Sequence, residues 1–276
     1  MTNLDFAKDV LRWHLDVGVD ETIGPDPVNQ FTLAQRSVQA SATPPTSSGV
    51  FPSKSPPAGS TIVSRPENSG PGPSGEEAVK SAYEQAEQAK TIDDLRTALE
   101  TFDGCALKKT ATNLVFYNGD PKARLMLVGE APGAQEDRQG EPFVGPSGAL
   151  LDKMLTSIDI SRADVLVSNT VFWRPPGNRT PTPQETAVCM PFVERLIELV
   201  DPDVLVTLGG PAAKALLGET QGVGRLRGRW FTFETARMSH PIDTTAMFHP
   251  AYLLRTPSQK RATWQDLLRI QDKLTQ

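Results

Sequence analysis

The sequence predicts an α/β fold in which helices cover both faces of a four-stranded parallel sheet. Four short apolar runs between residues 124 and 248 alternate with segments of helical periodicity. Strands separated by helices favour parallel pairing, because the crossover helix returns the chain to the edge of the sheet where the first strand began. At 276 residues, 38% of them hydrophobic, the chain is long enough for one sizeable core with additional segments.

The strands and helices of this domain follow one another in a regular order. Residues 76–102 are rich in Ala, Glu, Lys and Leu, and the sequence TIDD at 91–94 is a second helix start within them. Ser147 is a candidate N-cap for the helix that follows the first strand. The strands are predicted at 124–129, 164–169, 203–208 and 244–248, and the helices at 147–157, 183–200, 211–217 and 258–272.

The N-terminal part has a different composition. Residues 1–22 hold a short amphipathic helix with one stripe of Leu and Ala, which packs either on the main domain or on a partner. Residues 23–75 are dominated by Pro, Ser, Gly and Thr, and such a segment buries too little apolar surface to offset its ordering entropy. We therefore expect a disordered linker at 23–75 and a compact domain at 76–276.

Composition and charge narrow the class of protein. The formal net charge of -5 argues against a protein that holds long nucleic acid by bulk electrostatics, although it leaves room for a local basic groove. The apolar runs fall short of a membrane span, and the first residues, MTNLD, lack the basic start of a signal peptide, so we expect a cytoplasmic protein. Cys105 and Cys189 are far apart in the sequence and do not suggest a disulfide framework.

Polar or glycine residues follow each predicted strand. They are Glu130, Asn169, Gly210 and His249. The carboxyl ends of parallel strands meet at one edge of a sheet, where open α/β folds bind ligands. We therefore expect these residues, which follow four separate strands, to line one crevice.

Glu130 stands in the turn GEAPG at 129–133, directly after the first strand and Gly129. It would be the first acidic group in the crevice, although such a turn is as often an ordinary bend of the chain. Glu136 and Phe143 follow in a polar loop. The Phe143 ring either stacks on a base, an interaction worth about 1 to 3 kcal/mol, or packs into the core.

Asn169 and His249 carry groups that suit a nucleobase. An Asn amide both donates and accepts, so it can recognise the N3–H and O4 of uracil and reject cytosine; at a strand end it can equally form a turn. A His imidazole can donate to a carbonyl oxygen that gains negative charge, although a lone His is more often a satisfied structural residue. Leu253, close behind His249 among exposed-looking apolar residues, could fill the gap that an extruded base leaves.

Three further segments suggest contacts with phosphates. Arg174 and Arg179 lie in the stiff loop RPPGNRTPTP at 174–183, which is either a rigid, phosphate-facing wall or a solvated connector. The sequence GGP that begins at Gly209 opens a helix and exposes backbone N–H groups that suit an anion, as simple turn chemistry also explains. Arg255 ends the sequence HPAYLLR, beside the crevice.

Together these segments resemble the uracil-DNA glycosylase superfamily, most closely its bacterial and archaeal family-four enzymes. The matching segments span most of residues 100–270, in order. They are GEAPG, EPFVG, the Asn169 strand end with RPPGNRTPTP, LGGPAAKALLG and HPAYLLR. The resemblance implies a three-layer α/β/α fold, a monomer, and hydrolysis of the N-glycosidic bond of uracil in DNA, which leaves an abasic site.

The same resemblance implies roles for the site residues. Glu130 resembles the acid that orients water or steadies the sugar cation, and His249 resembles the donor to the leaving base. Phe143 resembles the stacking platform, and Asn169 the group that recognises uracil. The residues expected to bind substrate are Gly129, Glu136, Phe143 and Asn169, and those expected to bind DNA are Arg174, Arg179, Gly210, Leu253 and Arg255.

Family-four enzymes usually hold a [4Fe–4S] cluster on four cysteines, and here the chain departs from the family. Cys105 and Cys189 match two of the four positions, but Phe102 and Trp173 stand at the other two. Two thiolates are too few for a normal four-cysteine site. We therefore expect no metal cofactor, and we expect aromatic packing to bring these four side chains together in place of the cluster.

A second interpretation comes from another class of protein. A non-hydrolytic module that recognises uracil or damaged DNA would keep the crevice but use Glu130 and His249 only for binding. Residues 1–22 would tether such a module to a replication or repair partner. An assay for strand scission at uracil after alkali separates the enzyme from the binding module.

Overall fold

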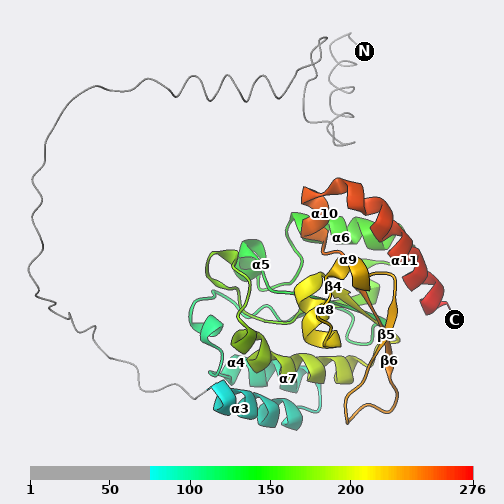
Figure 1. The fold of residues 1–276 in the computed structure, drawn as a ribbon. Helices are drawn as coiled ribbons and strands as arrows, with labels where there is room; N and C mark the ends of the chain where they lie inside the picture. Colours follow the sequence, from blue (N-terminus) through cyan, green and yellow to red (C-terminus); the bar gives the residue numbers. More distant parts are fainter. Residues whose placement is uncertain (1–74, 276) are drawn as a thin grey trace, which may run out of the picture. The chain divides into compact units, whose positions relative to one another are not determined.

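The computed structural model describes residues 75–275, which form an α/β domain around a mixed sheet (Figure 1). The predicted helix at 1–22 and the predicted linker, up to residue 74, lie outside the described residues. The strands lie side by side in the order β1-β3-β2-β4-β6-β5. Their bounds are β1 (Tyr117–Gly119), β2 (Leu125–Gly129), β3 (Val165–Asn169), β4 (Val204–Leu208), β5 (Trp230–Phe233) and β6 (Ile242–Met247).

The four central strands are parallel, as the sequence predicts. β3 and β4 pair with opposite sides of β2, and β6 pairs with β4. Every residue of β2, β3 and β4 is buried because helices cover both faces, which explains their continuous apolar sequences. The predicted strand count is too low, since β1 and β5 add antiparallel edges. β1 (YNG) carries no apolar run, and β5 (WFTF) is aromatic but has only four residues, most of them exposed or half-exposed.

All four helices predicted to follow the strands are present, with ends within two residues of the prediction. The short helices α5, α9 and α10 were not predicted; the six residues of α5 are polar and carry no apolar stripe. The helices of the described part are α3 (Gly75–Gln88), α4 (Ile92–Thr101), α5 (Ala134–Gln139), α6 (Pro146–Thr156), α7 (Pro183–Val200), α8 (Gly210–Leu217), α9 (Val223–Leu226), α10 (Pro250–Arg255) and α11 (Lys260–Leu274).

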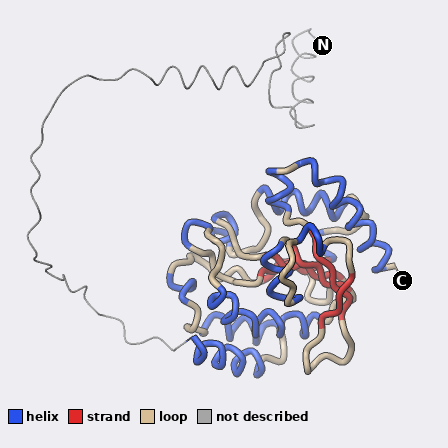
Figure 2. Tube along the Cα trace, viewed as in Figure 1, coloured by secondary structure: helices blue, strands red, loops and turns tan. Residues whose placement is uncertain are grey.

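The sheet separates two hydrophobic cores, which makes the fold a three-layer sandwich. On β2, Met126 and Val128 join the core beneath α3, α4 and α7. The alternate residues Leu125 and Leu127 join the core beneath α6, α10 and α11. Figures 1 and 2 show these two groups of helices on opposite faces of the strands. The predicted three-layer α/β/α class is therefore confirmed.

Local sequence explains where several helices begin. Thr91 caps α4: its hydroxyl accepts the Asp94 N–H at 3.1 Å, and the Asp94 carboxylate accepts the Thr91 N–H at 2.9 Å. The prediction that Ser147 caps α6 is wrong. Gly145 is the N-cap and Pro146 opens the helix, where its missing N–H would have no intrahelical partner in any case. None of the described helices has the length and hydropathy needed to cross a membrane.

Candidate functional site

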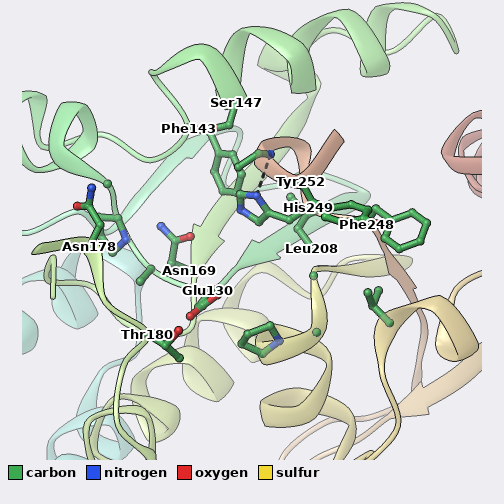
Figure 3. Close-up of a pocket in the computed structure, with 18 of the residues that line it drawn as sticks. Glu130, Phe143, Ser147, Asn169, Asn178, Thr180, Leu208, Phe248, His249 and Tyr252 are labelled. Atoms are coloured by element: carbon green, nitrogen blue, oxygen red, sulfur yellow. Dashed lines mark hydrogen bonds between the residues drawn. The ribbon is translucent and has the colours of Figure 1, made fainter. Parts of the chain in front are cut away.

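The carboxyl ends of the parallel strands open into a cavity of about 890 Å³ (Figure 3). Glu130 follows β2, Asn169 ends β3, Gly210 begins the helix after β4, and His249 follows β6. All four residues line the cavity, together with Phe143 from the loop before α6. The structure therefore brings together the groups that the sequence placed at the ends of four separate strands.

Glu130 is fixed through its backbone. Its carbonyl oxygen accepts hydrogen bonds from the Thr170 hydroxyl at 2.7 Å and from the Val171 N–H at 3.2 Å. Burial raises the pKa of the Glu130 carboxyl above its ordinary value, and a hydrogen bond with the Thr180 hydroxyl partly offsets that rise. The side chain thus presents a half-buried carboxyl group to the cavity at a defined position.

Asn169 presents an amide to the cavity that no described residue hydrogen-bonds. The residue is only 2% exposed, and its backbone pairs across the sheet with Gly129. A Cβ at Gly129 would lie 2.6 Å from the Asn169 Oδ1 and 2.7 Å from the Phe143 ring, so only glycine leaves room for both side chains. Among the described residues no fully buried side-chain N or O atom lacks a hydrogen-bond partner, so the unpartnered Asn169 amide is open to the cavity, where a ligand can supply its hydrogen bonds.

The Phe143 ring lines the cavity from a strained backbone position. Its φ of 57° is unusual for an aromatic residue, and strain of this kind is concentrated at functional sites. Gly148 of α6 approaches the loop so closely that a Cβ there would lie 1.8 Å from the Phe143 carbonyl oxygen. The ring stacks on the His249 imidazole, with centroids 5.6 Å apart and an interplanar angle of 28°. The Phe143 ring therefore packs on His249 and is also accessible from the cavity.

Glu136 lines the cavity, but its carboxylate holds the loop that carries Phe143. Oε1 accepts the N–H groups of Val144 and Gly145 at 3.2 and 3.1 Å, and Oε2 accepts the Gly133 N–H at 3.1 Å. Charge-assisted bonds of this kind are about twice as strong as neutral ones. The geometry favours a positioning function for Glu136 over direct contact with a substrate.

His249 is the N-cap of α10, and this position determines which nitrogen carries the proton. Nδ1 accepts the Ala251 N–H at 3.1 Å (Figure 3), so a neutral ring is protonated on Nε2. Burial, together with the positive charge of Arg255, lowers the pKa of His249 to about 4. At neutral pH the site therefore contains an uncharged imidazole with one N–H to donate.

The arginines predicted to contact phosphates differ in whether another side chain already binds their guanidinium groups. Arg179 lines the cavity, but its guanidinium is held by both oxygens of Glu185 at 2.7 and 2.8 Å, which lowers the pKa of that carboxyl to about 2. Arg174 does not line the cavity and donates to the Asn178 Oδ1 at 2.7 Å. Arg255 lines the cavity and is exposed, and no described carboxylate pairs with it.

The expectation that Leu253 is exposed is wrong. Leu253 is 1% exposed and packs in the core with α6 and α11, because its position on α10 turns it inward. Its neighbour Leu254 is 44% exposed and is the apolar side chain of this helix that faces solvent. The sequence did not distinguish the two, since the register of so short a helix depends on its N-cap at His249.

Sequence analysis also missed residues that line the cavity. Thr180, whose hydroxyl bonds Glu130, lies in the segment RPPGNRTPTP, where only the arginines had been singled out. Phe248 and Tyr252 flank His249 and line the cavity with it. Their rings pack on each other with centroids 5.0 Å apart. Their neighbourhood in the sequence was the available signal, but it did not say which way each side chain points.

Cys105 and Cys189 meet in the core beneath α3, α4 and α7. Their sulfur atoms are 4.0 Å apart, and both thiols are free and buried. Phe102 and Trp173 belong to the same extended core of buried residues as the two cysteines. The Phe102 ring packs edge-on against Phe192 with centroids 5.1 Å apart.

These side chains do not fit a four-cysteine iron–sulfur cluster. Residues 75–275 contain no group of three or more His, Cys, Asp or Glu residues that could hold a metal ion. The hydrogen bond between the two thiols lowers the pKa of Cys105 and, together with burial, raises the pKa of Cys189, so the buried pair does not favour the two thiolates that a metal would bind.

Comparison with known proteins agrees with this geometry. The family model described as Uracil DNA glycosylase superfamily matches residues 116–268. The chain is 37% identical over 185 residues to a Type-4 uracil-DNA glycosylase of Archaeoglobus fulgidus, covering 66% of this chain and 92% of that relative. It is 40% identical over 157 residues to the Type-4 enzyme of Thermotoga maritima, covering 56% of this chain and 79% of that relative. The chain belongs to the uracil-DNA glycosylase superfamily.

Proposed function

We propose that this protein is a uracil-DNA glycosylase, which hydrolyses the N-glycosidic bond of uracil in DNA and leaves an abasic site. The observation that carries the proposal is the Asn169 amide, which belongs to a residue only 2% exposed and opens to the cavity with no hydrogen-bond partner among the described residues. Its neighbours in the cavity are the Phe143 ring and the neutral imidazole of His249. The relatives named Type-4 uracil-DNA glycosylase support the same function.

Recognition begins when uracil leaves the base stack, at a cost of a few kcal/mol. Stacking on Phe143 returns about 1 to 3 kcal/mol. The Asn169 amide then accepts from the uracil N3–H and donates to O4. Cytosine presents an acceptor at N3 and a donor at C4, so it leaves the buried amide unpaired, and such mismatches give strong discrimination.

Bond cleavage separates charge between the sugar and the base. As the bond between C1′ and N1 lengthens, its electron pair moves to the base, and the sugar becomes positive. The His249 Nε2–H donates to the base oxygen that gains negative charge, and the Glu130 carboxylate favours the positive sugar and orients water. The water oxygen bonds to C1′, and its released proton balances the uracil anion. Both side chains therefore act mainly in the transition state.

Contacts with DNA surround the cavity in this proposal. Arg255 and the backbone N–H groups at Gly210 are available at its mouth, whereas Arg174 and Arg179 first have to leave the partners that hold them. Leu254 replaces Leu253 as the side chain that enters the space of the extruded base.

The domain organisation that we propose is the one expected from the sequence. We assign the catalytic domain to residues 76–276, a linker to 23–75, and attachment to a repair or replication partner to 1–22. We infer a cytoplasmic enzyme with no metal cofactor, in which the packing of Phe102 and Trp173 replaces an iron–sulfur cluster.

The test is strand scission after alkali on an end-labelled oligonucleotide with one uracil. The parent should produce scission at uracil and none at cytosine. Asn169→Ala removes both hydrogen bonds to the base, so its kcat/KM on uracil should fall about 10-fold to 100-fold, with selectivity falling as well. Asn118→Ala, which changes an amide on β1 outside the cavity, is the matched control and should cleave like the parent.

Two results would contradict the proposal. Cleavage by Asn169→Ala at the parent rate would remove the assigned recognition group. Tight binding of uracil-containing DNA by the parent without any scission would favour the non-hydrolytic module.

A further inference from the structure

A second hollow, of about 390 Å³, adjoins the candidate active site. The two cavities share the short helix α10: Tyr252 and Arg255 line the active site, and Leu253 lines the hollow. Helix α6 also reaches both, with Ser147 at the active site and Lys153 at the hollow. Helices α6, α10 and α11 lie side by side in this part of the molecule (Figure 1). The two cavities are therefore neighbours, with α10 contributing residues to both.

The hollow combines a cationic rim with an apolar floor. Lys153, Lys260 and Arg261 line it and are exposed, and none of them forms an ion pair with another described residue. No carboxylate lines it. Trp264 also lines the hollow and is 41% exposed, which leaves much of a large aromatic side chain open to solvent. The floor consists of Leu150, Met154, Leu253 and Leu267.

We propose that this hollow is a binding site for single-stranded DNA that flanks the uracil, and we call it the flank site (Lys153, Lys260, Arg261 and Trp264). The inference rests on the proposed function, because it takes the strand in the active site as its starting point. Unpaired cations suit phosphates, and an exposed aromatic side chain beside them suits an unpaired base, the combination that single-strand binding proteins use. The stack accepts any base, so this site adds affinity without adding sequence preference.

The separation of the two cavities also predicts how many nucleotides lie between the uracil and the base bound in the flank site. A helix with its side chains is about 10 to 12 Å across, and α10 stands between the two cavities. A stacked strand advances about 3.4 Å per nucleotide. A base in the flank site is therefore about three nucleotides from the uracil, and on one side of it only.

The experiment measures KM for glycosylase activity on single-stranded oligonucleotides in which each flank is lengthened separately from about two to about eight nucleotides. The parent should show a fall in KM once one of the flanks passes about three nucleotides, and no such fall for the other flank. Trp264→Ala should lose this gain, with KM about 5-fold to 150-fold above the parent, the range that one base stack corresponds to. On the shortest substrate, which does not reach the flank site, its KM should equal that of the parent.

The cations have a separate readout. Lys260→Ala combined with Arg261→Ala should lower the slope of log KM against log salt by about 0.7 per cation removed, on long flanks only. Both side chains are exposed and form no ion pair with a described residue, so we expect this double variant to fold. It therefore provides a second test of the proposal if Trp264→Ala does not fold. The controls are Trp230→Ala, which changes a tryptophan of similar exposure on β5, and Lys122→Ala, an exposed cation that shortly precedes β2 and lines neither cavity. Both should behave like the parent.

An unchanged dependence of KM on flank length in both flank-site variants would overturn the proposal. Absence of cleavage by the parent would instead refute the proposed function, and fluorescence anisotropy with uracil-free single strands would then test the flank site alone. In that measurement, Trp264→Ala should raise the Kd relative to Trp230→Ala, and equal Kd values would overturn the proposal.

Discussion

His249 shows how the surroundings of one side chain determine its chemistry. In the folded protein its pKa is lowered from 6.5 to about 4, chiefly by burial. In the unfolded chain the imidazole takes up its proton near the ordinary pKa of about 6.5. Between these two values protonation favours the unfolded state. The stability that His249 contributes is therefore complete above pH 6.5 and is lost as the pH falls toward 4.

His249→Gln should remove this dependence. Between pH 7 and pH 4 the parent should lose about 3 kcal/mol more unfolding free energy than the variant, because a glutamine takes up no proton. Urea unfolding at the two pH values measures the difference. His240→Gln is the matched control, since His240 is half exposed and outside the cavity, and it should follow the parent. A parent and His249→Gln variant with parallel pH profiles would contradict the low pKa.

At the residue scale, sequence predicted which side chains meet but not how each is held. Asn169 and His249 were located because they end strands of a parallel sheet, and topology alone brings such residues together. The crowding around Gly129 depends on the positions of two distant side chains, which no local pattern records. Leu253 was misjudged for a similar reason, since one position along α10 decides between core and solvent.

The loop before α6 is an element held by one carboxylate. Glu136 accepts N–H groups from the start of α5 and from the loop at Val144 and Gly145, so it joins the two segments that form one wall of the cavity. The same loop keeps Phe143 at its positive φ. A strained conformation persists only where its surroundings determine it strongly.

Glu136→Ala should release this loop and lower kcat/KM about 10-fold to 100-fold, because the stacking ring loses its fixed position. Hydrogen exchange gives a readout that separates positioning from direct contact with substrate. The amides of Val144 and Gly145 should exchange faster in the variant without DNA, since their acceptor is gone. Glu141→Ala, an exposed acid of the same loop, is the control. Unchanged exchange at both amides would contradict the positioning function.

At the element scale, the sequence predicted the strands and helices whose apolar pattern follows from their burial, and it missed several short elements. The central strands are buried on both faces, so their apolar runs were visible, and the helices that cover them carry apolar stripes. β1 and α5 are short and mostly polar, so they resemble loops in the sequence, whereas β5 (WFTF) is aromatic but has only four residues, most of them exposed or half-exposed. Their presence depends on hydrogen bonds to strands and loops that are distant in the sequence.

At the scale of the whole molecule, the two cores on opposite faces of the sheet have different functions. The core beneath α6, α10 and α11 includes Phe143, Phe248 and Leu253, so it supports the cavity directly. The core beneath α3, α4 and α7 contains the two cysteines and lies on the other face. In the proposed enzyme this second core has a structural task, which aromatic packing fulfils.

Iron analysis tests whether the core beneath α3, α4 and α7 is purely structural and holds no iron–sulfur cluster. Protein purified anaerobically should show no visible absorption band and should contain far fewer than about four irons per chain, because only two thiols stand where a cluster needs four ligands. Phe102→Ala should lower the unfolding free energy by about 3 to 5 kcal/mol, the usual effect of removing a fully buried Phe. Cys105→Ala removes much less volume and should cost less, whereas loss of a cluster ligand would cost far more. An iron-dependent absorption band in the parent, abolished by Cys105→Ala, would show that a cluster holds this half of the domain together.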